Sequence, residues 1–139
     1  MKQAQHTLEI ATRGQGLYEI TGEVTEWAGR QGVATGMLNI YCRHTSASLI
    51  IQENADPNVM RDLEAFFSET VPEDAARYRH RSEGTDDMPA HIKGALTGVS
   101  LNIPVADGAP LLGTWQGIFL FEHRTKPHRR LVVLHLTGT

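Results

Sequence analysis

The sequence predicts an α+β fold: a single compact domain over residues 1–139, with a largely antiparallel sheet and two to three helices. Its length is that of one domain, and no linker, internal repeat or low-complexity tract divides it. Segments with strand character do not alternate regularly with helical ones, as they would in a doubly wound parallel sheet. The first observation favours a single domain, and the second favours antiparallel pairing of neighbouring strands.

Four strands and one helix are predicted in the first part of the chain. The strands are Thr7–Thr12, Leu17–Ile20, Val33–Arg43 and Ala47–Gln52. The first of them alternates apolar and polar residues, which is the pattern of a half-buried strand. Between the second and third strands, Thr21 can cap a helix over Gly22–Gly29. The apolar side of that helix carries Val24, Trp27 and Ala28.

The next helix starts at Asp56-Pro57, where the aspartate suits the N-cap and the proline suits the first helical position. Helical spacing predicts that this helix buries its apolar residues. These are Val59, Met60, Leu63, Phe66 and Phe67. The charged segment from Tyr78 to Asp87 then predicts a loop.

A third helix is predicted to open at Pro89 and to end before Gly98. Its expected buried face carries Ile92, Ala95 and Leu96. Turns rich in glycine, aspartate and proline separate the last segments, which read as strands. These are Val99–Val105, Trp115–Glu122 and Leu131–Leu136.

Composition and charge exclude several classes of protein. Thirteen lysines and arginines against sixteen acidic residues give a net charge of −3, which argues against broad nucleic-acid binding. No apolar run exceeds four residues, so no membrane-spanning helix is expected. Cys42 is the single cysteine, and the N-terminus has no apolar segment typical of a secretory signal. The chain is therefore expected to be cytoplasmic.

Histidine is abundant, with seven residues, and the segment around His80 and His91 predicts a metal site. Asp87 and His91 are four residues apart, so both project from one face if the helix begins near Asp87. His80 can fold back from the loop as a third ligand. Nitrogen and carboxylate ligands with an open position suit a catalytic divalent ion. Alternatively, Asp86 and Asp87 cap the helix and His91 is a surface residue.

Polar residues at strand ends supply further candidates. His44 lies beside Thr45 and Ser46, but no nucleophile elbow is present, so these groups are expected to bind a phosphate or a metal-bound ligand. Glu53 is a candidate functional residue because the adjacent helix does not require it as a cap.

Two more segments have structural and functional interpretations. Trp115 is expected in the core, with Gln116 as its hydrogen-bonded neighbour. The segment Glu122–Arg124 ends an apolar strand, so it is either an active-site position or a solvated rim.

Four motifs, taken in order, resemble the YjbQ family, also called the secondary thiamine-phosphate synthase family. They are His44-Thr45-Ser46-Ala47-Ser48, Glu53-Asn54-Ala55-Asp56-Pro57, the segment from Glu83 to Lys93, and Gly113-Thr114-Trp115-Gln116-Gly117. The resemblance runs from about residue 5 to Gly138. It implies a compact α+β homotrimer with a cleft near the subunit contacts. It also implies a metal held by histidines, which supports His80 and His91 and makes His44 a neighbour of the site.

The activity that this resemblance implies is thiamine-phosphate synthesis, in which a thiazole phosphate displaces pyrophosphate from hydroxymethylpyrimidine pyrophosphate. A divalent ion such as zinc, manganese or magnesium would neutralise the leaving group. Lys93 or Arg124 would stabilise the developing charge, and Glu53 or His44 would manage protons. Two other classes remain: a metal-dependent hydrolase of a small phosphorylated or acyl metabolite, and a non-catalytic anion-binding trimer.

Overall fold

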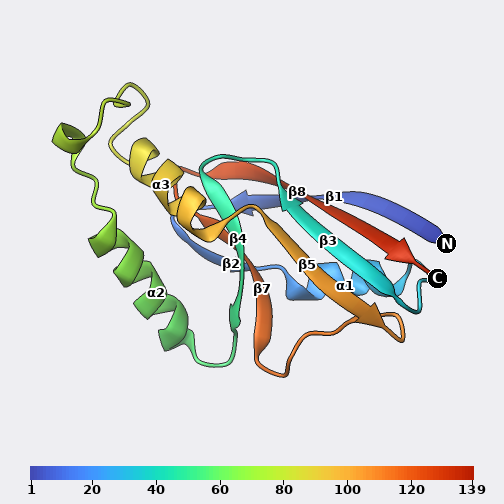
Figure 1. The fold of residues 1–139 in the computed structure, drawn as a ribbon. Coiled ribbons are helices and arrows are strands. Elements are labelled where there is room, and N and C mark those ends of the chain that lie inside the picture. The colour runs from blue at the N-terminus through green and yellow to red at the C-terminus, as the bar shows by residue number, and fades with distance from the viewer.

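The computed structural model describes residues 1–139 as two antiparallel sheets with three α-helices (Figure 1). The strands are β1 (Lys2–Thr12), β2 (Gly16–Glu19), β3 (Gly36–Cys42), β4 (Ala47–Glu53), β5 (Ser100–Ala106), β6 (Ala109–Pro110), β7 (Gln116–Glu122) and β8 (His128–Gly138). The helices are α1 (Thr21–Gly29), α2 (Pro57–Thr70), the 3-10 turn η1 (Ala75–Arg77) and α3 (Asp87–Thr97). The predicted α+β class and antiparallel pairing are confirmed.

The strands form two separate sheets rather than one. The larger has the order β1-β8-β3-β5-β6, and the smaller has the order β2-β7-β4. β1 pairs with β8 along its whole length, from Lys2 opposite Gly138 to Thr12 opposite His128. The two termini therefore lie side by side at one end of the molecule (Figure 1). β1 begins five residues before the strand predicted there, because pairing with the long β8 extends it.

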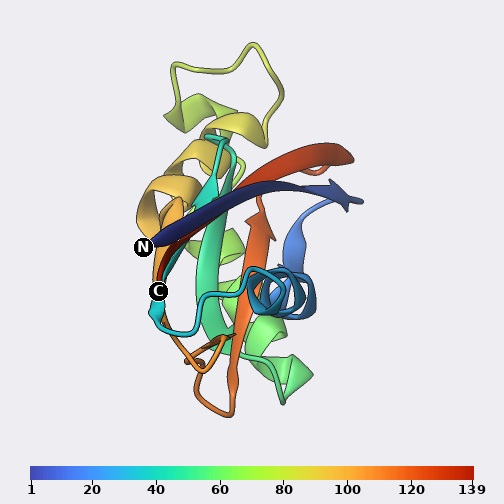
Figure 2. The same cartoon turned by 90° about the vertical axis from the view of Figure 1, so that its right-hand side faces the viewer.

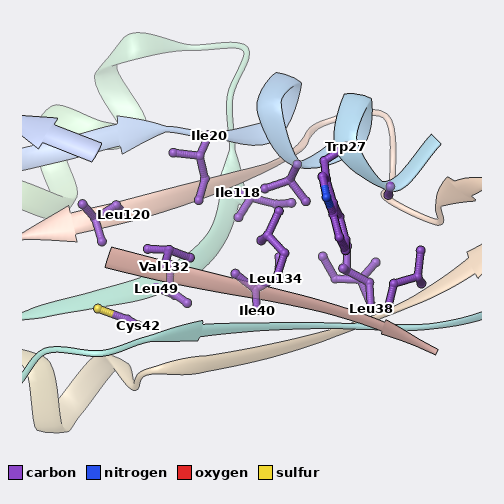
Figure 3. Packing of buried hydrophobic residues seen from close by; sticks show 14 of the residues in the cluster. Ile20, Trp27, Leu38, Ile40, Cys42, Leu49, Ile118, Leu120, Val132 and Leu134 are labelled. Carbon is purple, nitrogen blue, oxygen red and sulfur yellow. The ribbon is translucent and has the colours of Figure 1, made fainter. Parts of the chain in front are cut away.

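The core lies between the facing sides of the two sheets. Figure 3 shows Ile40 and Leu134 from the large sheet pointing toward Leu49 and Ile118 from the small one. Alternate residues of each strand fill this space because successive side chains point to opposite faces. α1 covers one end of the core, and its predicted apolar side, which includes Trp27, is buried as expected.

The predicted N-cap is confirmed at α2 and is wrong at α1. At α2, the side chain of Asp56 accepts a hydrogen bond of 2.9 Å from the backbone N–H of Asn58, as expected of the N-cap. At α1, Thr21 is the first helical residue and does not cap it. Its hydroxyl accepts instead from the backbone N–H of Ile118, at 2.8 Å, and so ties the helix to β7.

α2 and α3 lie on the outer side of the small sheet, as the views of Figures 1 and 2 agree. The prediction that α2 buries its apolar residues within the chain is wrong. None of its residues is buried, and Phe66 is 57% exposed. Phe67 provides the main contact, edge-on to Phe121 of β7 with ring centroids 5.4 Å apart.

α3 begins at Asp87, two residues before the predicted start at Pro89. Its expected buried face is also wrong: Ala95 and Leu96 are exposed. The helix instead buries Pro89, Ala90, Lys93 and Gly94. The reason is its close approach to the turn between β3 and β4, where a Cβ on Gly94 would lie 3.3 Å from the carbonyl oxygen of Thr45. No helix of the structure is both long and apolar enough to cross a membrane.

Candidate functional site

The N-terminal turn of α3 and the preceding loop bring three potential metal ligands together. One ligand atom from each of His80, Asp87 and His91 lies within 4.8 Å of the others. Oδ2 of Asp87 is 2.7 Å from Nε2 of His80 and 3.2 Å from Nε2 of His91. These three residues are called the His–Asp–His cluster below, and α3, which carries Asp87 and His91, lies at the end of the molecule opposite the termini (Figure 1). The structure therefore assembles the three predicted ligands in one place.

The neighbouring backbone orients His91 for ligation. Its Nδ1 lies 3.0 Å from the carbonyl oxygen of Thr45, which can only accept a hydrogen bond. Nδ1 therefore carries the proton, and Nε2 presents its lone pair to the cluster. Histidine ligands of metals in proteins are typically held by such a hydrogen bond from the second ring nitrogen.

Arg124 holds the carboxylates at the start of α3. Its Nη1 donates to Oδ1 of Asp87 at 2.7 Å, its Nε donates to Oδ2 of Asp86 at 2.8 Å, and its Nη2 donates to the carbonyl of Glu83 at 2.8 Å. The backbone N–H of Thr125 also donates to Asp86, at 2.9 Å. Asp86 occupies the N-cap position of α3, as the alternative interpretation expected, but its side chain makes no capping hydrogen bond and binds Arg124 and Thr125 instead.

These contacts keep both aspartates ionised. Burial alone would raise the pKa of Asp86, but the hydrogen bonds from Arg124 and Thr125 outweigh it and lower the pKa to about 2. Burial opposes ionisation of Asp87 as well, and its contacts with His80 and Arg124 lower its pKa below the ordinary value. The cluster thus holds a permanent carboxylate between two imidazoles.

The chemistry of these donors fits a divalent metal ion. Two imidazole nitrogens and one carboxylate oxygen are the ligands of many catalytic zinc sites, which leave further positions open for water or substrate. Manganese and magnesium accept the carboxylate but are less suited to two nitrogens, so zinc is the ion that the donor set favours. His80 lies on an exposed loop and provides access from solvent.

His44 lies close to the cluster without being part of it. It shares with His91 a cavity of ≈ 240 Å³, which is also lined by Gly94 and Val99. The backbone N–H of Leu131 donates to its Nε2 at 2.7 Å, and its Nδ1 lies 3.4 Å from Nη1 of Arg130. Burial, together with the charge of Arg130, lowers the pKa of His44. Its ring is therefore neutral near pH 7 and is fixed by the backbone.

Of the other predicted site residues, Glu53 and Lys93 lie away from the cluster, and Arg124 contacts it. Glu53 is the last residue of β4, whereas Ala47 at the other end of that strand lies near the cluster, so about 20 Å separates the two ends. Lys93 follows His91 on α3 but lines a different pocket, and burial lowers its pKa. Arg124 contacts the cluster through Asp87, where its guanidinium is committed to carboxylates and a carbonyl.

The segment Glu122–Arg124 is not a solvated rim, because Glu122 and His123 are 0% and 1% exposed. Glu122 forms a buried ion pair with Arg130, whose Nε donates to Oε1 at 2.8 Å. The sequence analysis did not single out Arg130, and it named Ser48 only as part of a motif. Both are buried in strands, Arg130 in β8 and Ser48 in β4, where Oγ of Ser48 lies 2.9 Å from Nε2 of His123. Trp115 was expected in the core but is 62% exposed.

Comparison with known sequences identifies relatives over nearly the whole chain. A family model described as UPF0047 protein YjbQ-like matches residues 6–139. A UPF0047 protein of Synechocystis is 53% identical over 137 residues, covering 99% of this chain and 93% of the relative. The UPF0047 protein YjbQ of Salmonella typhimurium is 47% identical over 135 residues, covering 96% and 97%.

Solved structures share the fold. A conserved hypothetical protein of Thermus thermophilus superposes with a TM-score of 0.85 at 35% identity, covering 95% of this chain and 99% of that one. A YbjQ-like protein of Sulfolobus solfataricus gives a TM-score of 0.86 at 21% identity, covering 99% and 100%, and is similar in fold alone. The two-sheet architecture is thus found in relatives of divergent sequence.

Proposed function

The chain belongs to the YjbQ-like family of UPF0047 proteins, and from this premise we propose that it is a metal-dependent enzyme that forms thiamine phosphate. The observation that carries the metal dependence is the His–Asp–His cluster, with its ligand atoms within 4.8 Å of one another. The substrate assignment comes from the family resemblance of the four motifs. Both substrates are small phosphorylated metabolites, and neither nucleic acid nor membrane takes part.

The proposed reaction requires little from protein side chains. The thiazole nitrogen already has a lone pair, attacks the methylene carbon of the pyrimidine substrate and displaces pyrophosphate. No proton needs to be removed from the nucleophile, which agrees with the lack of a Ser–His–Asp arrangement. A bound divalent ion supplies the positive charge that stabilises the leaving pyrophosphate.

The residues around the cluster prepare it for that role. The carbonyl of Thr45 holds His91 so that its Nε2 faces the cluster. Arg124 binds Oδ1 of Asp87, so that Oδ2 points to the histidines. The backbone N–H of Leu131 fixes the ring of His44, which shares a cavity with His91. Fixed donors and charges of this kind stabilise a transition state without reorganisation during the reaction.

A metal-dependent hydrolase of a small phosphate or acyl ester is the second candidate. It is favoured by the cluster's composition, because three protein ligands leave a position for water and His80 is reached from solvent. An anion-binding protein without turnover is the third. Such a protein would bind an anion saturably but would form neither thiamine phosphate nor a hydrolysis product.

The test combines the purified protein with the pyrimidine pyrophosphate and the thiazole phosphate and measures thiamine phosphate. We expect product that disappears on chelation and in His91→Ala, and that persists in His135→Ala, a histidine of β8 outside the cluster. Release of acid or phosphate from a small ester without the thiazole would favour the hydrolase. No thiamine phosphate above the metal-only control would overturn the synthase.

We also propose that the enzyme is a cytoplasmic homotrimer. The apolar side of α2 supports an assembly, because its residues are at most half-buried in the single chain.

A further inference from the structure

A second polar pocket lies on the other side of α3 from the His–Asp–His cluster. His91 and Lys93 are two residues apart and so point about 200° apart around the helix axis. Lys93 lines a cavity of ≈ 170 Å³ together with Phe67 of α2 and with Phe121 and His123 from the end of β7. No ligand of the cluster lines this cavity. We call it the Lys93 pocket.

Lys93 is a buried cation without a bonded counterion. Its side chain belongs to a residue that is 5% exposed, and no carboxylate lies within ion-pair distance of it, unlike Arg124 and Arg130 nearby. Lysine is almost never buried unless it is paired, because removing an unpaired charge from water is costly. The ammonium group of Lys93 is therefore available to a ligand in this cavity.

His123 contributes the second unsatisfied group. It is 1% exposed, and its Nδ1 is the one buried side-chain nitrogen or oxygen without a hydrogen-bond partner. Buried polar atoms in proteins are nearly always bonded to protein or water. An orphaned atom next to a buried cation, in the wall of one cavity, indicates a bound partner.

A hydrogen-bond chain determines what Nδ1 can do. The Thr97 hydroxyl lies 2.8 Å from the carbonyl of Lys93 and 2.5 Å from Oγ of Ser48. The carbonyl only accepts, so it takes the single Thr97 proton, and the Ser48 hydroxyl supplies the proton between the two hydroxyl oxygens. Oγ of Ser48 must then accept from Nε2–H of His123, 2.9 Å away. Nδ1 is left as an acceptor that lacks a donor.

We propose that the Lys93 pocket binds a small oxyanion that carries a hydroxyl group, of which hydrogen phosphate is the simplest. The charged oxygens bind the ammonium group of Lys93, and the hydroxyl donates to Nδ1 of His123. Charge-assisted hydrogen bonds of this kind are stronger than hydrogen bonds between two neutral groups. This site does not depend on the reaction proposed above, because no ligand of the metal cluster takes part.

The acidic residues at the pocket leave room for an anion. Glu122 is neutralised by its ion pair with Arg130 and accepts a hydrogen bond of 2.6 Å from Thr12. Glu64 lies on the side of α2 and accepts from the backbone N–H of Leu17 at 3.3 Å. Its other oxygen can accept from further hydroxyls of a larger ligand, which would favour a phosphate ester of a polyol over a bare anion.

Titration of metal-stripped protein with inorganic phosphate at constant ionic strength tests the site, with calorimetry and the melting temperature as readouts. We expect saturable heat and a rise in Tm for the wild type. Lys93→Met should bind phosphate about 10- to 100-fold more weakly, as expected for loss of a charged hydrogen bond. Lys2→Met, which removes an exposed lysine at the far end of β1, is the matched control and should bind normally.

Further variants separate this site from others. Lys93→Met removes an unpaired buried charge, so it should fold and melt higher than the wild type without phosphate. Ser48→Ala leaves Lys93 in place but frees the His123 ring, and should also weaken binding. His91→Ala should bind phosphate normally. Binding lost in His91→Ala and kept in Lys93→Met, or no saturable binding by the wild type, would overturn the proposal.

Discussion

Arg124 and Asp87 are joined by a hydrogen bond of 2.7 Å from Nη1 to Oδ1, on the carboxylate oxygen that does not face the histidines. Oδ2 of the same carboxylate meets His80 and His91. One arginine on the segment after β7 therefore fixes the orientation of a ligand at the start of α3. The two segments are far apart in sequence, and this ion pair is one of several contacts that link them at the site.

Replacing Arg124 should weaken metal binding although Arg124 is not a ligand. We expect Arg124→Gln to bind zinc about 10- to 100-fold more weakly, the usual effect of losing a residue that orients a ligand. Competition with a zinc-binding dye measures this affinity. Arg129→Gln removes an exposed arginine of β8 that pairs with Glu9, and should leave the affinity unchanged. Equal affinities for all three proteins would contradict the role of Arg124.

Metal content should distinguish the cluster from the other predicted site residues. His91→Ala removes one of three ligands, so metal per chain in elemental analysis should fall sharply. Glu53→Gln should retain the full content, because Glu53 lies at the opposite end of β4 from the cluster. A folded His91→Ala variant with full metal content would exclude His91 as a ligand.

Local signals in the sequence located some elements closely, because such signals depend on neighbouring residues. Periodicity located β4 and β7 almost to the residue, and Asp56-Pro57 marked the start of α2. Division of the strands into two sheets depends on pairing between distant segments, such as β1 with β8, which no local pattern encodes.

Contacts between distant segments also decide the candidate site, and the sequence did not predict them. Spacing suggested Asp87 and His91, since both lie on one turn of helix. The contacts that orient them come from Thr45 and Arg124, which are 46 and 37 residues away in the chain from their partners. Lys93 was expected beside the metal ligands, but it lies on another side of α3 from His91 and lines a different pocket.

Buried His123 should make stability depend on pH between about 3 and 6.5. Burial, with the charge of Lys93, lowers its pKa to about 3, whereas an unfolded histidine titrates near 6.5. In this window the unfolded chain binds a proton that the folded chain does not, so acidification favours unfolding. The free energy of unfolding should fall by about 1.4 kcal/mol from this residue for each pH unit below 6.5.

Urea denaturation from pH 7 to pH 5 measures this effect before most carboxylates titrate. His123→Gln should show a flatter dependence than the wild type, and His135→Gln should retain the wild-type slope. Identical slopes for the wild type and His123→Gln would show that His123 is not buried as a neutral residue.

The apolar side of α2 should be covered by another copy of the chain. Val59, Leu63 and Phe66 recur at helical spacing, yet Phe66 is 57% exposed and none of the three is buried. Exposed apolar surface of this kind is typical of an interface between protein chains. If this face builds the homotrimer proposed above, sedimentation equilibrium should give about three times the chain mass of 15.4 kDa. Phe66→Glu should dissociate the assembly at micromolar concentration, because it places a charge in a desolvated contact. Ala65→Glu, on the polar side of the same helix, is the matched control and should remain assembled. A wild-type protein with the mass of one chain at these concentrations would show that α2 is exposed in solution and would remove the argument for a trimer.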